Sequence, residues 1–345
     1  MFGKTFTDHM LEIDWTAEKG WHSPVIKPYE NFSVSPAISS LHYGMQCFEG
    51  MKAYRDENNK IRIFRPELNM ARMNNSMTRL SMPGFDGEQF IKCMEELLRV
   101  EKEWIPQERG YSLYIRPTGI STQPTLGVGA PQECKLYVIL SPVGPYYPEG
   151  FNPVKLYASK KCVRAWPGGT GDVKIGGNYA ATIEPQMEAA RKGYTQCLWL
   201  FGDDAEVTEV GTMNFFVLWE KPDGTGRELL TAPLDGTILP GVTRQTVLDL
   251  AREWGDFDVS ERVFTMKELT SALDENRVVE AFGCGTAAVV SPIKAIYYEG
   301  KEYDVPLQKE NPDALAGHLT QKFWDTITGI QYGAIESPYS IVVED

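Results

Sequence analysis

The sequence lacks the long apolar runs and the cysteine patterns that mark membrane, secreted and zinc-binding proteins. Its longest apolar runs, such as CLWLF, are far too short to cross a bilayer. The first residues contain no apolar core of signal-peptide length. The 6 cysteines are scattered, without a C-x-x-C pair or a cysteine–histidine pair at zinc spacing. We therefore expect a cytoplasmic protein with free thiols and no zinc site.

Basic residues are scarce as well. The chain has 34 lysines and arginines against 47 aspartates and glutamates, so its formal net charge is −13. General nucleic-acid binding depends on cations that neutralise phosphates, and this balance argues against it. The excess of negative charge favours solubility and leaves small-molecule chemistry open.

What the chain does contain is typical of a folded protein of about two domains. Hydrophobic residues make up 42% of the 345 residues and aromatic residues 11%. Strand-like segments rich in β-branched and aromatic residues alternate with amphipathic segments such as FDGEQFIKCMEELLRVEKEW. We expect a mixed α/β (α+β) protein with a smaller domain over residues 1–142 and a larger one over 154–345. The proline- and glycine-rich stretch over 143–153 predicts the interdomain loop, and a ligand site is expected between the domains.

One lysine has an unusual setting. The stretch GGTGDVKIGGNYA places Lys174 among several glycines, with Val173 before it and Ile175 after it. A phosphate-binding P-loop requires lysine directly after glycine and a hydroxyl residue next, so that interpretation fails. A lysine with apolar neighbours can have a lowered pKa, and its neutral amine can form a Schiff base with a carbonyl. Glycines would let a planar ligand approach the backbone.

A second glycine-rich stretch suggests a rival. GCGTAA, residues 283–288, formally matches the dinucleotide motif G-x-G-x-x-[GA] and follows the strand-like RVVEAF. That motif requires a helix immediately afterwards. Here VVSPIKAIYYEG follows, which is rich in β-formers and contains Pro292. The interpretation of the chain as a nicotinamide-dependent oxidoreductase therefore depends on one motif in the wrong structural context. The N–H groups of such a turn could still hold a phosphate.

If the carbonyl belongs to pyridoxal phosphate, the chemistry makes three further demands. The pyridine nitrogen needs a carboxylate, the phenolic oxygen a donor and the phosphate a cup of N–H groups. Glu209 lies just before a predicted strand, and Tyr179 follows Lys174 by five residues. The turn TILPGVT leads into a predicted helix whose first N–H groups, at Val242 and Thr243, would form an anion site. Each candidate by itself also has an ordinary structural explanation.

Seven blocks of the sequence together resemble the branched-chain amino-acid aminotransferases, pyridoxal-phosphate enzymes of fold type IV. The blocks are LHYGMQCFEGMKAY, FRPELNMARM, SLYIRP, VRAWPGGTGDVKIGGNYA, TEVGTMNFF, ILPGVTRQ and FGCGTAAVVSP. The resemblance implies a two-domain fold like that of D-amino-acid aminotransferase. It also implies reversible transamination between leucine, isoleucine or valine and 2-oxoglutarate. A D-amino-acid aminotransferase and an aminodeoxychorismate lyase are alternatives of the same fold, and a non-catalytic binding protein is a third.

The resemblance assigns cofactor roles to specific positions. Lys174 is implied to be the Schiff-base lysine and to carry a proton between the substrate's α-carbon and the cofactor's C4′. Glu209 is implied to pair with the pyridine nitrogen, and Tyr179 to bind the phenolic oxygen. The other implied cofactor residues are Arg72, Val242, Thr243 and Thr286 at the phosphate, Arg164 in the wall of the site near the phosphate, and Thr212 near the ring.

The resemblance also implies a substrate pocket whose walls suit two kinds of side chain. Tyrosines accept both an apolar side chain and glutamate's second carboxylate, because the ring is apolar and the hydroxyl is a donor. Arg116 is a candidate for that second carboxylate; alternatively, it is a structural ion-pair partner and tyrosine hydroxyls bind the carboxylate. The implied wall residues are Tyr43, Phe48, Tyr114, Tyr146, Trp166, Tyr179, Met213, Thr286 and Ala287.

Family members complete this pocket with the partner subunit of a homodimer. The resemblance therefore implies that Tyr43 and the loop TLGVGAP, with Leu126 and Val128, project across an interface between two copies of the chain. The segment GPYYPEG, which contains Tyr146, is implied to act as a lid over the substrate.

Overall fold

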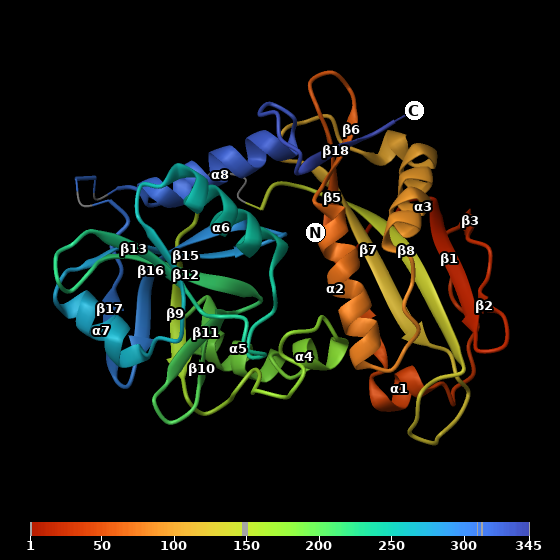
Figure 1. Ribbon diagram of the computed structural model, residues 1–345, viewed down its shortest axis with the longest axis horizontal. Coiled ribbons are helices and arrows are strands. Elements are labelled where there is room, and N and C mark those ends of the chain that lie inside the picture. The colour runs from red at the N-terminus through yellow and green to blue at the C-terminus, as the bar shows by residue number, and fades with distance from the viewer. Residues whose placement is uncertain (1, 147–150, 309, 312, 345) are drawn as a thin grey trace. The chain divides into compact units, whose positions relative to one another are not determined.

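The computed structural model describes residues 2–146, 151–308, 310–311 and 313–344 (Figure 1). The chain forms two compact units. Unit 1 consists of Met1–Tyr146, Val173–Gly177 and Gly329–Asp345, and unit 2 of Tyr147–Asp172 and Asn178–Thr328.

The first division falls within the expected interdomain loop, but two segments expected in the C-terminal domain cluster with unit 1. The segment Val173–Gly177 does so because Val173 and Ile175 are buried in the core of that unit. The C-terminal segment does so because β18 (Ser340–Val343) pairs with β6 (Ile61–Phe64) of unit 1. Neither the packing of Val173–Gly177 into unit 1 nor the pairing of β18 with β6 could be predicted from neighbouring residues in the sequence.

The described part of unit 1 is built on one nine-stranded antiparallel sheet. Its strand order is β18-β6-β5-β7-β8-β1-β2, with β3 beside β1 and β4 beside β7. The remaining strands are β1 (His9–Thr16), β2 (Gly20–Trp21), β3 (Val25–Pro28), β4 (Gln46–Phe48), β5 (Met51–Arg55), β7 (Ser112–Ser121) and β8 (Glu133–Val143).

Two amphipathic helices cover the core of unit 1. α2 (Pro66–Arg79) begins with proline, whose fixed backbone angle suits the first helical position. α3 (Gly87–Val100) is capped by the Asp86 carboxylate, which accepts a hydrogen bond from the Gln89 N–H at 3.1 Å. Their apolar faces pack with the sheet into one core. The shorter helices of the unit are α1 (Ser39–Tyr43) and the 3-10 turn η1 (Lys102–Trp104).

The described part of unit 2 contains a second nine-stranded sheet, in the order β11-β10-β9-β16-β15-β12-β13-β14, with β17 beside β16. Because β11 also pairs with β12, the strands from β11 round to β12 close into a ring. The strands are β9 (Val154–Ser159), β10 (Gln196–Phe201), β11 (Glu206–Val210), β12 (Met213–Glu220), β13 (Arg227–Thr231), β14 (Asp258–Glu261), β15 (Val278–Gly285), β16 (Val289–Tyr298) and β17 (Lys301–Asp304).

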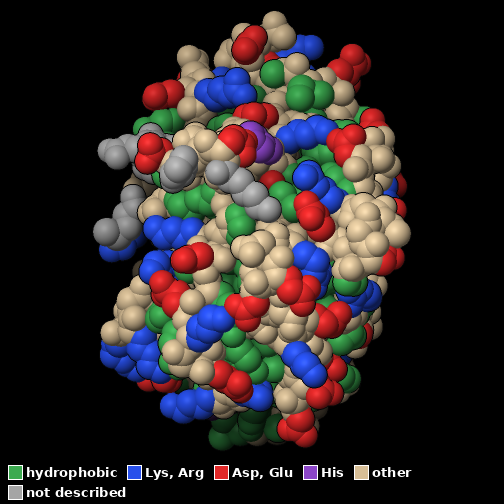
Figure 2. All heavy atoms as spheres, turned by 90° about the vertical axis from the view of Figure 1, so that its left-hand side faces the viewer, with side chains coloured by type: hydrophobic (Ala, Val, Ile, Leu, Met, Phe, Trp, Pro, Cys, Tyr) green, Lys and Arg blue, Asp and Glu red, His purple; other side chains and the backbone are tan. Residues whose placement is uncertain are grey.

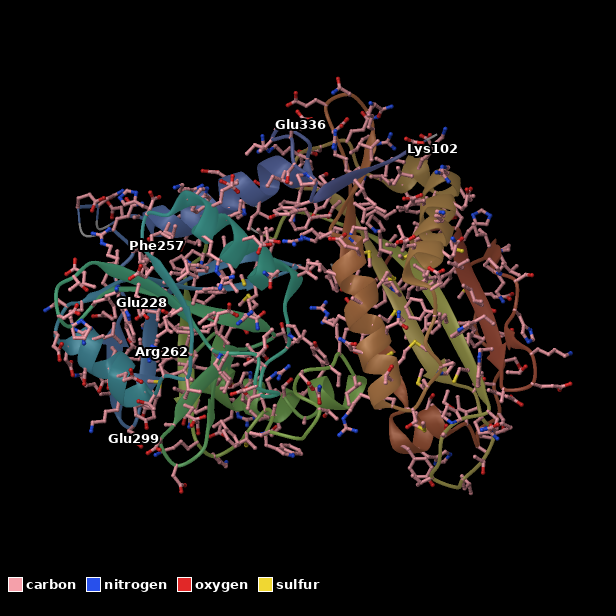
Figure 3. All side chains as sticks on the ribbon, viewed as in Figure 1. Lys102, Glu228, Phe257, Arg262, Glu299 and Glu336 are labelled. Atoms are coloured by element: carbon pink, nitrogen blue, oxygen red, sulfur yellow. The ribbon has the colours of Figure 1, made fainter. Side chains whose placement is uncertain are left out.

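Helices and charged pairs flank this sheet. Figure 3 labels Glu228 on β13 and Arg262 just after β14; their charged groups lie 3.7 Å apart across the two parallel strands. The remaining helices of the chain are α4 (Gly176–Ala180), α5 (Ile183–Arg191), α6 (Val242–Trp254), α7 (Met266–Asp274) and α8 (His318–Gln331).

The start of α8 depends on a buried carboxylate. Glu280 accepts hydrogen bonds from the Leu319 N–H at 2.9 Å, the Thr320 N–H at 2.8 Å and the Thr320 hydroxyl at 2.6 Å. The first N–H groups of a helix have no partner within the helix, so this carboxylate supplies what the local sequence lacks.

Replacing Glu280 by alanine is expected to lower the free energy of unfolding by about 2 kcal/mol, because it leaves buried donors unpaired. Glu302→Ala is the control: Glu302 also lies in unit 2, and its ion pair with Lys155 is more than a third exposed on both sides. That control should cost less than about 1 kcal/mol. Urea unfolding at pH 7 measures both variants, and equal losses would contradict a specific role for the cap.

Every helix in the described part of the chain is too short or too polar to span a lipid bilayer. Figure 2 shows acidic and basic side chains interspersed over one face of the molecule, without a continuous basic stripe.

Candidate active site

Lys174 lies next to the isolated β-bridge between Ile175 and Cys47 and is held in place within unit 1. Its backbone N–H donates to the Ser76 hydroxyl at 2.8 Å, and its carbonyl accepts from the Phe48 N–H at 3.1 Å. Val173 and Ile175 are buried in the core of the unit. The Lys174 side chain itself does not belong to that core.

The charged form of Lys174 is disfavoured by its surroundings. The side chain is half-buried, and its Nζ lies 4.9 Å from the centroid of the Phe48 ring. Burial, followed by the positive charge of Arg72, lowers the pKa of Lys174 from 10.5 to about 8. About one lysine in ten is then neutral at pH 7, and the neutral amine is the nucleophilic form.

Arg72 is held by a buried carboxylate. Its Nε and Nη2 each lie 2.7 Å from an oxygen of Glu49, whose side chain is 0% exposed. Glu49 also accepts from Asn69 Nδ2 at 2.7 Å and from the Gly50 N–H at 3.2 Å. A guanidinium presents its N–H donors in a rigid plane, so this pair fixes the orientation of Arg72.

Sequence reasoning missed Glu49. A glutamate between Phe48 and Gly50, in the strand-like block QCFEGMKAY, was a detectable signal because buried strands seldom carry an unpaired acid. The identity of its partner was not detectable, since Arg72 lies 23 positions away on a helix.

Arg116 has aromatic neighbours but no acidic partner among the described residues. Its guanidinium carbon lies 4.7 Å from the Phe48 ring centroid and 5.1 Å from that of Tyr114. Its Nη2 donates to the Tyr114 hydroxyl at 3.0 Å, while its buried Nε has no hydrogen-bond partner. The alternative in which Arg116 serves a structural ion pair thus finds no carboxylate in the part of the chain that the structure describes.

These residues form one cluster in unit 1. The charges or hydroxyls of Arg72, Glu49, Tyr114 and Arg116 all lie close enough to influence the pKa of Lys174. Gly50 makes room for the cluster, because a Cβ at that position would lie 2.0 Å from the Tyr114 hydroxyl oxygen. The arrangement combines a nucleophilic amine, two cations and apolar rings, which suits a carboxylate-bearing substrate with an apolar or acidic side chain.

Unit 2 contains a buried carboxylate held by three donors. Glu209, near the end of β11, accepts from the Leu239 N–H at 2.9 Å and from Asn214 Nδ2 at 3.1 Å through one oxygen. Its other oxygen lies 2.5 Å from Arg164 Nε. The predicted role of Arg164 near the phosphate stays a prediction. In the structure its guanidinium binds Glu209 and donates to the Gly171 and Thr237 carbonyls, each at 3.3 Å.

The N-terminus of α6 can accept an anion. Its N-cap is Gly241, and no side chain caps the helix, so the first N–H groups, including those of Val242 and Thr243, are suited to a phosphate. A Cβ at Gly241 would lie 2.1 Å from the Asn214 side-chain oxygen. Glycine is therefore required for this turn to approach β12.

The stretch GCGTAA joins two antiparallel strands. β15 ends at Gly285 and β16 begins at Val289, which pairs with it, so Thr286 and Ala287 lie in a tight turn. No helix follows, and the dinucleotide interpretation therefore fails on the geometry that it requires.

The remaining predicted site residues have varied positions. The Tyr43 hydroxyl donates to the Leu126 carbonyl, which joins two exposed residues of unit 1. Met213 packs in the core of unit 2, next to Gly283 and Gly285. Of the segment predicted as a lid, residues 147–150 lie outside the described residues. Tyr179, in α4, is half-buried. The predicted site residues that are exposed include Thr212, Ala287, Val128, Tyr146 and Trp166.

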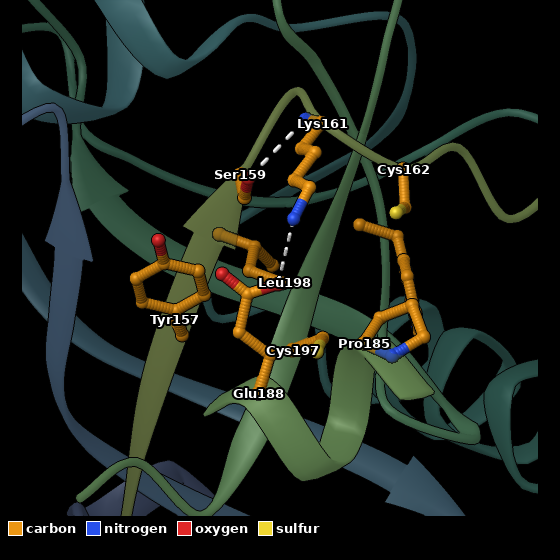
Figure 4. A pocket seen from close by; sticks show the side chains of 9 residues that line it. Tyr157, Ser159, Lys161, Cys162, Pro185, Glu188, Cys197 and Leu198 are labelled. Atoms are coloured by element: carbon orange, nitrogen blue, oxygen red, sulfur yellow. Dashed lines mark hydrogen bonds and ion pairs between the residues drawn. The ribbon is translucent and has the colours of Figure 1, made fainter. Parts of the chain in front are cut away.

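A small cavity of unit 2 is separate from these residues. Figure 4 shows it between Tyr157, Glu188 and Cys197, with the Lys161 ammonium 3.3 Å from the Glu188 carboxylate. Its volume of about 20 Å³ holds roughly one water molecule. The cavity is too small for an amino acid, and none of the predicted site residues lines it.

The family model of the class IV aminotransferases matches residues 46–296. The chain belongs to this family. This chain is 54% identical over 345 residues to the branched-chain-amino-acid aminotransferase of Dictyostelium discoideum, and the match covers 100% of this chain and 90% of that protein. The predicted family, aminotransferase activity and mixed α/β fold of type IV are thereby confirmed.

Solved structures share this fold. The branched-chain aminotransferase of Thermoproteus uzoniensis, solved with norvaline, has a TM-score of 0.76 and 26% identity, covering 96% of this chain and 99% of that chain. The branched-chain amino acid aminotransferase of Thermobaculum terrenum, solved in its PLP-form, has a TM-score of 0.75 and 23% identity, covering 99% of each chain. At that identity the second likeness shows the fold alone.

Proposed function

We propose that this aminotransferase transfers the amino group of leucine, isoleucine or valine to 2-oxoglutarate, reversibly, with pyridoxal phosphate as its cofactor. The observation that carries the proposal is the Lys174 amine, whose pKa is lowered to about 8 in a cluster with Arg116, a cation with no acidic partner among the described residues. The full-length identity to a branched-chain-amino-acid aminotransferase supports the substrate class over the D-amino-acid and aminodeoxychorismate alternatives.

The residues fit pyridoxal phosphate by the chemistry of their donors. A lysine amine with a lowered pKa, a buried carboxylate fixed by three donors and a helix start without a side-chain cap are the groups that this cofactor requires. When bound, pyridoxal phosphate supplies an aldehyde that bonds to amines and a protonated ring that withdraws electrons from the substrate's α-carbon. We propose that Lys174 holds it, with Glu209 at the ring nitrogen and Tyr179 at the phenolic oxygen. The proposed phosphate ligands are Arg72 and the N–H groups of Val242, Thr243 and Thr286.

The chain's own groups account for the proton movements. Neutral Lys174 Nζ accepts a proton, and the resulting ammonium returns it; a pKa of about 8 allows both at neutral pH. Glu209 stays in place because Arg164, Asn214 and the Leu239 N–H hold both of its oxygens, so its negative charge is available to a protonated ring nitrogen. Glu49 fixes the orientation of Arg72 in the same manner.

The substrate side chain meets two kinds of surface in unit 1. The Phe48 and Tyr114 rings suit the apolar side chains of leucine, isoleucine and valine. The Arg116 guanidinium, packed against both rings, suits the second carboxylate of glutamate and 2-oxoglutarate. One cluster thereby accepts both partners of the reaction.

We further propose that two copies of the chain form a homodimer. Tyr43, Leu126 and Val128 are 43%, 64% and 82% exposed, although all three are large and apolar, and a hydrogen bond joins the first two. Grouped apolar side chains at the surface mark contacts between proteins. The loop with Leu126 and Val128 would then reach the partner copy's substrate.

Absorption spectra test the function directly. The visible band of the protein with pyridoxal phosphate should diminish when L-leucine is added alone and return when 2-oxoglutarate follows, because the two half-reactions run in sequence. A band that ignores L-leucine but responds to D-alanine would assign the D-specific alternative. A protein that develops no band with added pyridoxal phosphate would refute the assignment of Lys174.

A further inference from the structure

Asn214 lies within the family block TEVGTMNFF but has no role among the proposed cofactor contacts. It lies on β12, is 4% exposed and pairs directly with Glu209 of β11 and with Cys284 of β15. Asparagine is uncommon within buried strands, because its amide needs partners that a sheet does not supply. The buried amide of Asn214 in the block TMNFF therefore requires specific hydrogen-bond partners.

The carboxamide of Asn214 joins two segments that are distant in the sequence. Its Nδ2 donates to Glu209 Oε1 at 3.1 Å and to the Leu239 carbonyl at 2.9 Å. Both partners are acceptors, so the NH₂ end of the amide must face them. The opposite end, Oδ1, lies against Gly241, where a Cβ would approach it to 2.1 Å.

The turn before α6 is tied to the same carboxylate from its other side. The Leu239 N–H donates to Glu209 Oε1 at 2.9 Å. Leu239 thus gives its N–H to the carboxylate and its carbonyl to Asn214, while α6 begins three residues later at Val242. Glu209, Asn214 and Leu239 form a closed triangle of hydrogen bonds that sets the distance from the carboxylate to the helix start.

We propose that Asn214 is a positioning residue that couples the ring-nitrogen contact of the cofactor to its phosphate contact. The inference rests on the proposed function, in which Glu209 faces the pyridine nitrogen and the α6 N-terminus faces the phosphate. These two groups sit on one rigid aromatic molecule at a fixed separation. A ligand at either contact orders the Glu209–Asn214–Leu239 triangle, so the other contact then forms with less further ordering and the two contacts bind cooperatively.

The chemistry at this position admits few replacements. Aspartate would place a second carboxylate within about 3 Å of Glu209 and repel it. Alanine removes both hydrogen bonds but leaves Glu209 with Arg164 and the Leu239 N–H, so the carboxylate itself stays paired. Asn214→Ala therefore isolates the coupling, and Asn214→Asp tests the same link with nearly unchanged volume.

The experiment measures binding to the protein freed of cofactor, using pyridoxal without phosphate, inorganic phosphate and both together. In the unmodified protein each probe should strengthen the binding of the other about tenfold or more. In Asn214→Ala and Asn214→Asp this mutual effect should fall to less than twofold, and pyridoxal phosphate should bind about tenfold more weakly. The phosphorus-31 and ring nitrogen-15 signals of bound pyridoxal phosphate should both move.

Thr231→Val is the matched control. Thr231 lies on β13, is 1% exposed and donates to the Phe215 carbonyl at 2.7 Å, so its loss disturbs the same sheet without touching Glu209. In this control, pyridoxal and inorganic phosphate should still strengthen each other's binding. The phosphorus-31 and nitrogen-15 signals of bound pyridoxal phosphate should stay where they are in the unmodified protein. A mutual effect that survives in both Asn214 variants, or that falls equally in Thr231→Val, would overturn the inference. If the unmodified protein fails to bind pyridoxal phosphate at all, the proposed function fails instead.

Discussion

Replacing Lys174 by alanine is expected to lower the rate of transamination by at least about 10⁴-fold, since the same amine holds the cofactor and moves the proton. The fold should remain, because the contacts that anchor this segment come from its backbone and from Val173 and Ile175. Steady-state rates with L-leucine and 2-oxoglutarate measure the loss, and circular dichroism checks the fold. Residual activity within about 100-fold of the unmodified enzyme would contradict the role of Lys174.

Lys52 provides a matched control for this experiment. It lies on β5 of the same unit, and burial lowers its pKa to about 8 as well. If a lowered pKa were sufficient, both lysines would capture pyridoxal phosphate. We expect borohydride reduction and peptide mapping to find the pyridoxyl group on Lys174 and not on Lys52. The rate of capture should rise with pH up to about 8 and then level off, as the Lys174 amine becomes neutral.

Replacing Arg116 by glutamine is expected to lower kcat/KM for 2-oxoglutarate by about 100-fold, because a charge-assisted hydrogen bond contributes roughly 1.5–3 kcal/mol. The value for L-leucine should change less than about fivefold, since its side chain carries no charge. The difference between the two substrates is the decisive measurement. Equal losses for both would show that Arg116 has only a structural role.

Two further variants separate the alternatives for the second carboxylate. Arg116→Lys keeps the charge but loses the planar group that packs against the Phe48 and Tyr114 rings, so an intermediate loss is expected. Tyr114→Phe removes the hydroxyl that accepts from Arg116. If tyrosine hydroxyls bind the carboxylate, Tyr114→Phe should impair 2-oxoglutarate more than Arg116→Gln does; we expect the opposite order.

Patterns within short stretches were sufficient to find the candidate nucleophile. Lys174 stands between two apolar residues in a glycine-rich frame, and the structure buries Val173 and Ile175 in a core to which the lysine side chain does not belong. The same local logic predicted the strand-rich context after GCGTAA, which the structure shows as the turn between β15 and β16. Both inferences depend on neighbours in sequence.

The partners of buried charges could not be predicted in this way. The sequence did not indicate that Arg72 pairs with the buried Glu49, or that Arg164 pairs with Glu209. The roles predicted for both arginines near the cofactor's phosphate stay predictions. Asn214 was not noticed at all. Each of these contacts joins residues on different elements, and a sequence pattern specifies which side of its own element a residue occupies, not which residue lies opposite.

The sequence by itself determined the family, the mixed α/β class and the lysine on which the proposed chemistry depends, because these follow from local motifs and periodicity. Only the tertiary structure decided that the Lys174 segment belongs with unit 1, that Arg116 packs against two rings with no acidic partner in the described part of the chain, and that Asn214 ties Glu209 to the start of α6. The physical reason is that burial and pairing of charges arise when distant segments pack together, and that packing sets the pKa values and orientations on which the site depends.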